Sequence, residues 1–311
     1  MSFAIVFPGQ GAQSVGMLAG LAEGSPEVEQ TFREASEVLD ADLWQLSQSG
    51  PEEQLNRTEW TQPALLAAGI AVWRIWASRK GPEPVALAGH SLGEYTALVA
   101  AGALDFADAV RLVHFRGQVM QEAVPEGEGA MAAILGLEDE QVIALCRDAA
   151  GDQVVEAVNF NSPGQVVIAG HREAIDRAIE AASEAGAKRA MPLPVSVPSH
   201  CRLMEPAARR MGEALRETEI REPQWPVIHN CDLGAHAAPD AIRDALVAQL
   251  HNPVRWVETI GVLRERGAES LVECGPGKVL TGLNRRIERR MPAHPVQDEA
   301  SLEKALGALA G

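Results

Sequence analysis

The sequence predicts an α/β protein in which a large parallel-sheet domain carries a smaller, inserted ferredoxin-like domain. In the first third of the chain, short apolar runs lead directly into helical segments, a pattern typical of a parallel sheet covered by helices. A Pro-Glu-Gly-Glu-Gly segment interrupts this pattern at residues 125–129, and the order β-α-β-β-α-β follows it. We therefore expect residues 1–124 and 198–311 to form the large domain and residues 125–197 to form the small one.

The individual elements follow from apolar periodicity and from the glycines and prolines that bound each run. In the large domain, strands are predicted at residues 4–7, 85–88, 227–229 and 271–273, and helices at residues 92–101, 105–121, 240–250, 256–266 and from 279 onward. In the small domain, strands are predicted at residues 130–135, 153–159, 166–169 and 187–194, and helices at residues 138–149 and 173–185. The Asn-Ser-Pro-Gly segment at residues 161–164 predicts the turn between the two middle strands.

Length and composition exclude several classes of protein. A chain of 311 residues that is 46% hydrophobic is long and apolar enough for a sizeable core, so it is not disordered. Four cysteines are too few for a disulfide scaffold and show no zinc spacing, so we expect no metal. The net charge of −16 argues against a broad face for nucleic acid or an anionic membrane. No secretory signal or membrane span is apparent, and we expect a cytoplasmic enzyme.

The most informative segment is Ala-Gly-His-Ser-Leu-Gly-Glu at residues 88–94. It matches GxSxG between a predicted strand and a predicted helix, which is the context of a nucleophile elbow in α/β-hydrolase-like folds. We therefore predict that the large domain is of this kind and that Ser91 is a nucleophile. The backbone N–H of Leu92 would form half of an oxyanion hole at the helix N-terminus. The alternative is a glycine-rich turn in which Ser91 caps the helix.

A serine nucleophile needs a general base, and eight histidines are available. His90 adjoins the serine, but neighbouring side chains at such a turn point in different directions, so it is rejected. His200 lies on the loop where the small domain returns to the large one, and connecting loops are where site residues concentrate. Its position favours His200 as the base but leaves the other histidines open.

Seven segments in the same order resemble one family, the malonyl-CoA:acyl carrier protein transacylases of fatty-acid synthesis. They extend over nearly the whole chain, and no motif position departs from the family pattern. The matching segments are Pro-Gly-Gln-Gly-Ala-Gln at residues 8–13, Gly-His-Ser-Leu-Gly-Glu-Tyr at 89–95, Arg-Gly at 116–117 with Met-Gln at 120–121, Asn-Ser-Pro-Gly-Gln at 161–165, Val-Ser-Val-Pro-Ser-His at 195–200, Asn-Pro-Val-Arg-Trp at 252–256 and Gly-Pro-Gly-Lys-Val-Leu at 275–280.

The resemblance implies a Ser-His dyad. Ser91 would take the malonyl group as an ester, and His200 would act as general base and then as general acid. The backbone carbonyl of Gln249 would orient the imidazole in place of an aspartate, since the third member mainly fixes tautomer and ring orientation. The backbone N–H of Gln10 would be the second oxyanion donor beside Leu92.

The resemblance also implies how the substrate is selected. Arg116 would hold the free carboxylate of malonyl by two parallel hydrogen bonds and would reject acetyl. Without the resemblance, we would predict that Arg116 is a solvated residue on the surface of a helix. Gln62 and Asn159 resemble positions near the family's pocket, although such polar residues are usually structural. Ser199 beside His200 resembles the form that accepts malonyl rather than methylmalonyl.

The expected reaction is ping-pong transfer of malonyl from coenzyme A to the phosphopantetheine thiol of acyl carrier protein. No cofactor and no metal is implied, and we expect a monomer. Three alternatives are kept: service to a polyketide pathway, a catalytically silent module, and a serine thioesterase or hydrolase. The last would need an acid between Ser91 and His200 in the sequence, for example Asp108, Asp152 or Asp176.

An acidic carrier poses a problem for a chain of net charge −16, because like charges repel. Basic residues do gather in two places: Lys278, Arg285 and Arg286 lie near the end of the large domain, and Lys188 and Arg189 lie in the small one. We predict that one or both patches dock the carrier. The alternative is that they are solvated surface residues.

Overall fold

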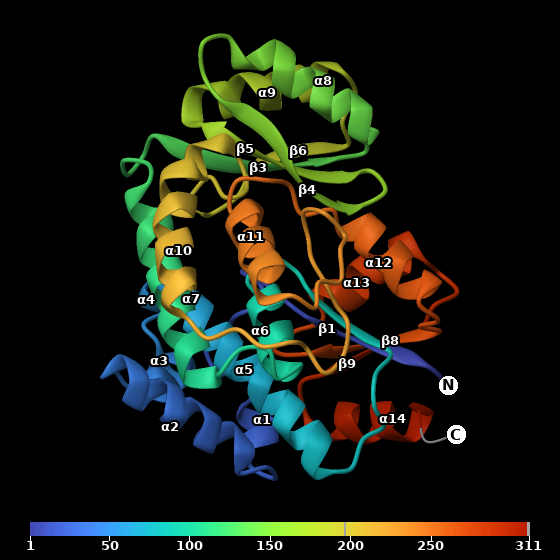
Figure 1. The fold of residues 1–311 in the computed structure, drawn as a ribbon. Coiled ribbons are helices and arrows are strands. Elements are labelled where there is room, and N and C mark those ends of the chain that lie inside the picture. The colour runs from blue at the N-terminus through green and yellow to red at the C-terminus, as the bar shows by residue number, and fades with distance from the viewer. Residues whose placement is uncertain (196, 310–311) are drawn as a thin grey trace.

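The computed structural model describes residues 1–195 and 197–309, and its larger part is built around a parallel sheet (Figure 1). The four predicted strands are present, with ends shifted by one or two residues. The outermost strand, β9, is not predicted by the sequence because it is half-exposed and contains a proline, which only edge strands tolerate. In spatial order the strands are β7 (Val227–Ile228), β2 (Ala86–Gly89), β1 (Phe3–Phe7), β8 (Ser270–Cys274) and β9 (Ala293–Val296).

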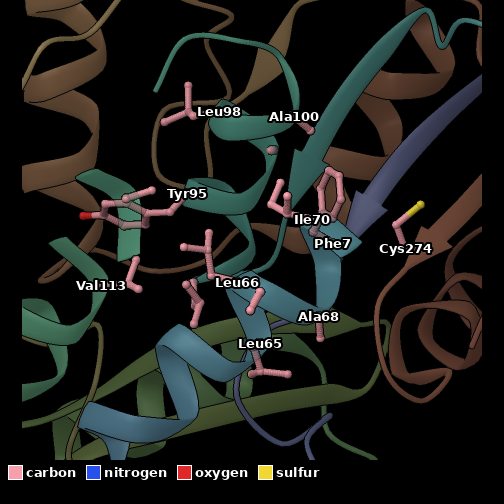
Figure 2. Packing of buried hydrophobic residues seen from close by; sticks show 14 of the residues in the cluster. Phe7, Leu65, Leu66, Ala68, Ile70, Tyr95, Leu98, Ala100, Val113 and Cys274 are labelled. Carbon is pink, nitrogen blue, oxygen red and sulfur yellow. The ribbon is translucent and has the colours of Figure 1, made fainter. Parts of the chain in front are cut away.

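The parallel sheet is buried on both faces, which explains the uninterrupted apolar run of β1. Phe3, Ile5 and Phe7 point into the larger core, whereas Ala4 and Val6 point into a second core on the opposite face. Figure 2 shows the packing of Phe7 in the larger core with side chains from three helices. The sheet therefore forms a rigid platform between two layers of helices, and its strand ends hold their loops in fixed positions.

Helices cover both faces of this sheet. The predicted helices at residues 92–101, 105–121, 240–250 and 256–266 and the one from 279 onward are present. Among the described residues, no helix is long and apolar enough to cross a membrane. The helices of this part are α1 (Ala19–Ala22), α2 (Glu27–Leu39), α3 (Leu43–Ser49), α4 (Glu52–Leu55), α5 (Thr58–Ser78), α6 (Gly93–Ala100), α7 (Phe106–Glu122), the 3₁₀ helix η1 (Arg202–Met204), α10 (Glu205–Glu217), α11 (Pro239–Gln249), α12 (Trp256–Glu265), α13 (Val279–Ile287) and α14 (Glu299–Leu309).

The smaller part is an antiparallel sheet with two helices on one face, at the top of Figure 1. Its strand order matches the predicted ferredoxin-like arrangement, while the exact domain boundaries stay a prediction. The second strand differs slightly from expectation, because β4 continues into the segment predicted as a turn. In spatial order the strands are β4 (Val155–Ser162), β5 (Gln165–His171), β3 (Gly129–Leu135) and β6 (Arg189–Pro192), and the helices are α8 (Asp139–Ala150) and α9 (Arg172–Glu184).

The small sheet uses its two faces differently. One face packs on α8 and α9 in a core of its own. Side chains on the other face, including Met131 and Val167, line the pocket described below. The edge strand β4 also joins the larger part by backbone pairing: Val254 donates to Val158 O at 2.8 Å, and Phe160 donates to Val254 O at 3.0 Å. The small sheet thus covers the carboxyl ends of the strands of the large sheet.

Candidate active site

The segment after β2 is the tight strand-to-helix turn that the GxSxG pattern predicts. Ser91 has a φ of +51°, a left-handed conformation that is strained for a serine. The flanking glycines are required by close backbone approach. A Cβ on Gly89 would lie 1.8 Å from the carbonyl carbon of Gly93, and a Cβ on Gly93 would lie 2.1 Å from the oxygen of Phe7. The elbow is therefore locked against both the first helical turn and the neighbouring strand.

The elbow follows β2, which pairs in parallel with β1, so the loops after these two strands lie side by side at the carboxyl edge of the sheet. A cavity of about 180 Å³ lies at this edge. The predicted site residues that line this cavity are Gln10, Gln62, Ser91, Leu92, Arg116, Asn159, Ser199 and His200.

Ser91 and His200 form a hydrogen-bonded dyad. The distance from Ser91 Oγ to His200 Nε2 is 2.7 Å, and His200 Nδ1 lies 2.8 Å from the backbone oxygen of Gln249. A carbonyl can only accept, so Nδ1 carries the proton and Nε2 is free to accept from the serine. The predicted roles of Gln249 and His200 match this geometry. His90 instead lies 2.8 Å from Asn161 Oδ1, as its rejection as the base requires.

The environment of His200 keeps its imidazole neutral. The ring is buried, and this burial, with the charge of Arg116 as a smaller cause, lowers its pKa to about 3. A neutral imidazole can accept the serine proton, whereas a protonated one cannot. The dyad is therefore in its reactive protonation state across the neutral range.

We expect the acylation of Ser91 to keep its rate well below the ordinary histidine pKa of about 6.5. Because the pKa of His200 is lowered, the reactive neutral form persists as the pH falls and is lost only as the pH nears about 3. The measurement is the rate of inactivation by a serine-directed phosphonate, with the brief reaction itself run at each pH. A decline centred near pH 6.5 would contradict the assignment.

Arg116 is buried on α7 beside the dyad, so its reading as a solvated helix residue is wrong. Its guanidinium donates to Gln62 Oε1 and to Gln249 Oε1, both at 2.9 Å, and lies 3.3 Å from Ser91 Oγ. Nε is buried without a partner, and no carboxylate of the described chain forms an ion pair with this guanidinium. A buried cation beside the nucleophile that lacks a direct carboxylate partner is a ready binding group for an anionic end of a substrate.

The acids required by the hydrolase alternative do not reach the base. Asp108 pairs with Arg111 at 2.9 Å on the outer side of α7, and Asp152 and Asp176 are exposed on the small part. The Nδ1 of His200 is already occupied by Gln249. A Ser-His-Asp triad in the hydrolase chain order is therefore absent from this site.

Comparison with known proteins agrees with this geometry. The family model of the acyl transferase domain matches residues 4–305. The malonyl CoA-acyl carrier protein transacylase of Escherichia coli (strain K12) is 57% identical over 304 residues, which cover 98% of each chain. This chain belongs to the malonyl CoA-acyl carrier protein transacylase family. The family predicted from the sequence segments is confirmed.

Solved structures of the transacylase family share the whole fold. The malonyl CoA-acyl carrier protein transacylase of Coxiella burnetii is 51% identical, with a TM-score of 0.99 over all of this chain and 98% of its own. A malonyl-transacylase in complex with a type II PKS acyl-carrier protein is 57% identical, with a TM-score of 0.98 over 99% of this chain and all of its own. The predicted α/β fold class is confirmed.

This member of the transacylase family also contains a buried polar cluster that sequence reasoning missed. Glu94 lies 2.7 Å from His229 Nδ1, and Asn230 donates from its side chain to Gly89 O and accepts from Ser91 N, both at 2.7 Å. Glu94 is part of the elbow motif, and His229 and Asn230 directly follow β7. Their position at the carboxyl end of a strand beside β2 was the available signal.

A metal site is not evident in the described chain. Within residues 1–195 and 197–309, no group of three or more His, Cys, Asp or Glu side chains is placed to hold a metal ion. All four cysteines are free.

Proposed function

We propose that this protein transfers a malonyl group from coenzyme A to the phosphopantetheine thiol of acyl carrier protein, through an ester on Ser91. The observation that carries the proposal is the buried guanidinium of Arg116, 3.3 Å from Ser91 Oγ. A carboxylate held by this guanidinium must lie close to the reacting carbonyl. Malonyl meets this condition because a single methylene separates its carboxylate from the thioester carbon.

In the first half-reaction, Ser91 Oγ attacks the thioester carbon while its proton passes to His200 Nε2. The carbonyl oxygen becomes an oxyanion, which the backbone N–H groups of Gln10 and Leu92 stabilise. The carbon–sulfur bond then breaks, and the departing coenzyme A thiolate takes the proton from His200. The products are the malonyl-Ser91 ester, free coenzyme A and a neutral base.

In the second half-reaction, the same groups act on the carrier. The phosphopantetheine thiol gives its proton to His200 Nε2, and its sulfur attacks the ester carbon. The carbon–oxygen bond breaks, and Ser91 recovers the proton from His200. Because the two thiols use one site in turn, ping-pong kinetics are expected.

The proposal includes no redox cofactor, because acyl transfer between thiols changes no oxidation state, and no metal, because the proposed steps use the backbone N–H groups for the oxyanion and His200 for the proton. We propose that the protein acts as a monomer, since one chain supplies every residue lining the pocket. We place the reaction in the cytoplasm, where four free cysteines are stable as thiols.

The proposal is tested by following radioactive malonyl. Incubation of the protein with labelled malonyl-CoA should leave label on the protein, and added holo-carrier should move that label to the carrier thiol. Free malonate formed at the same rate with or without carrier would instead support a thioesterase. A polyketide carrier is a second candidate acceptor, because the 57% identical structure holds one. The two candidates are ranked by offering a fatty-acid carrier and a polyketide carrier at equal concentration and measuring the label transferred to each.

For carrier docking, we propose a basic surface formed by both predicted patches. Arg286 on α13 donates to Gln165 Oε1 at 2.9 Å. Gln165 lies opposite Leu135, which in turn lies opposite Arg189, so Arg189 is two strand spacings from Gln165, about 10 Å. The basic members are Lys188, Arg189, Lys278, Arg285 and Arg286, which are all exposed.

Apolar side chains lie within the same surface. Met191 follows on the same strand as Arg189, and Val279 adjoins Lys278; the two are 40% and 46% exposed. Basic groups surrounding exposed apolar ones suit an acidic partner that also buries an apolar patch. The rest of a chain with net charge −16 would repel the same partner and help to orient it.

Reversing charge on this surface should weaken carrier binding. We expect Arg285→Glu with Arg286→Glu to raise the KM for carrier about tenfold at low salt, with little change in the KM for malonyl-CoA. Steady-state kinetics with each substrate varied in turn measure both constants. The matched control is Arg209→Glu with Arg216→Glu, which makes the same charge change on exposed positions of α10. If both double variants raise the KM for carrier equally, Arg285 and Arg286 contribute only through the net charge of the protein and do not form a docking surface.

A further inference from the structure

A buried carboxylate lies directly beneath the nucleophile and takes no part in the chemistry described above. Glu94 is fully buried in the first turn of α6. Its Oε1 contacts His229 Nδ1 at 2.7 Å, and its Oε2 accepts from the backbone N of Asn230 and from Gln249 Nε2, both at 2.9 Å. Both oxygens are therefore engaged, and the contacts of Oε2 lead to Asn230 and Gln249, which each contact Ser91.

The carboxylate of Glu94 acts on the imidazole beside it. Burial alone would lower the pKa of His229, but the charge and hydrogen bond of Glu94 outweigh burial and raise it. The two groups form an ion pair with both side chains fully buried. Such pairs contribute more to the geometry of a site than to net stability, because desolvation offsets their attraction.

The side-chain amide of Gln249 has one allowed orientation in this environment. Its Oε1 accepts from Arg116 at 2.9 Å, and its Nε2 donates to Glu94 and to the backbone oxygen of Ser91, both at 2.9 Å. Arg116 has only donors, whereas a carboxylate and a carbonyl only accept. A flipped amide would face the guanidinium with NH₂ and the carboxylate with oxygen, so both contacts would be repulsive.

The same cluster holds the strained backbone of the nucleophile from both sides. Ser91 N donates to Asn230 Oδ1 at 2.7 Å, and Ser91 O accepts from Gln249 Nε2. Asn230 follows β7 and Gln249 is the last residue of α11, and Glu94 contacts both. A left-handed serine persists only where its surroundings fix it, and these two amides do so.

We propose that Glu94, paired with His229, is a positioning residue that sets the distance between the nucleophile and the group that binds the substrate carboxylate. It orients Gln249, and Gln249 connects Ser91 with Arg116. It also holds the backbone of Asn230, whose side chain fixes Ser91. The proposal rests on the proposed function for the role of Arg116, but its effect on Ser91 does not depend on any acyl substrate.

The test compares three substitutions of Glu94 by two readouts. Inactivation by a serine-directed phosphonate reports on Ser91 and its base His200 without a substrate carboxylate, and the ratio of kcat/KM for malonyl-CoA to that for acetyl-CoA reports on Arg116. Glu94→Leu removes both acceptor oxygens. Glu94→Asp keeps the carboxylate but moves it away from its partners, because the side chain is one methylene shorter. Glu94→Gln leaves an oxygen for Asn230 and Gln249, and its NH₂ can face a neutral His229. The matched control is Thr96→Val, which removes another buried polar group from α6.

We expect Glu94→Leu to slow phosphonate inactivation and malonyl loading about 100-fold, because small misplacements have effects of this size. Glu94→Asp should do so to a smaller extent, and in both variants the malonyl-to-acetyl ratio should fall. Glu94→Gln should recover most of both readouts, and Thr96→Val should leave both unchanged. This recovery separates positioning from a loss of folded protein, which circular dichroism measures independently.

The proposal is overturned if folded Glu94→Leu and Glu94→Asp keep the wild-type phosphonate rate and the wild-type ratio. If Glu94→Leu does not fold, Glu94→Asp decides alone. A wild-type protein that reacts with phosphonate but never loads malonyl would contradict the proposed function. In that case the phosphonate rates of the variants would still decide the role of Glu94 at Ser91.

Discussion

Replacing Ser91 with alanine is expected to abolish formation of the malonyl ester, lowering transfer to carrier by at least about 10⁴-fold. Alanine removes the oxygen that lies 2.7 Å from His200 Nε2, and no neighbouring hydroxyl lies at this distance from the base in the described chain. The protein should still fold, since the turn is held by backbone contacts of Ser91 rather than by its hydroxyl. Radiolabel retained after acid precipitation measures the ester directly.

Ser199→Ala provides the matched control for this experiment. Ser199 also lines the pocket, but its hydroxyl is directed to Val197 O at 3.5 Å rather than to the base. This variant should still form the ester, and mass spectrometry should place the malonyl group on the peptide that contains Ser91. Label that persists in Ser91→Ala would remove Ser91 from its assigned role.

Replacing Arg116 with alanine should collapse the discrimination between malonyl and acetyl. The kcat/KM for malonyl-CoA should fall by about 10²–10⁴-fold, the effect of removing one partner of a buried charge pair. Acetyl-CoA, which has no carboxylate, should be used as well as before or better, since no unpaired cation would remain. A panel of malonyl-, methylmalonyl- and acetyl-CoA with saturating carrier measures the change.

The control for this variant lies on the same helix. Arg111→Ala removes an exposed guanidinium that pairs with Asp108 away from the pocket, so its effect on all three substrates should be small. If malonyl preference survives in Arg116→Ala, the carboxylate is bound elsewhere. The nearest alternative is the amide of Gln62, which lines the pocket and contacts the guanidinium in the present arrangement.

The sequence predicts the two helices of the small part correctly, because each has one buried and one exposed side. In the small part, α9 alternates buried alanines with exposed acids, so its helical period is visible. By contrast, α5 is buried nearly all around and contains Pro63, so it offers neither a polar face nor a clear start. Such a helix is determined by the core that surrounds it, which no local pattern expresses.

Some residues of the candidate site could be predicted from a local sequence pattern, and others could not. Ser91 stands in a local motif whose glycines have a steric cause, so sequence alone identifies it. Arg116 lies in an ordinary helical pattern, and only the family resemblance identified it as a pocket residue. The contact between Glu94 and His229 joins positions far apart in the sequence, and no single-chain pattern encodes which helix end meets which strand end. Ser91 was therefore predictable from a local motif, His200 was assigned as the base only through the family resemblance, and the supporting cluster was not predicted.

The pocket is assembled from two sheets that fold as separate layers, and this has an evolutionary consequence. Gln10, Ser91, Leu92 and Arg116 belong to the lower layer, whereas Met131, Val167 and Leu193 close the cavity from above. Mutations in the upper layer can reshape the space available to an acyl chain without altering the reacting atoms. Selection can therefore diversify which extender unit a lineage accepts while the catalytic step is inherited intact.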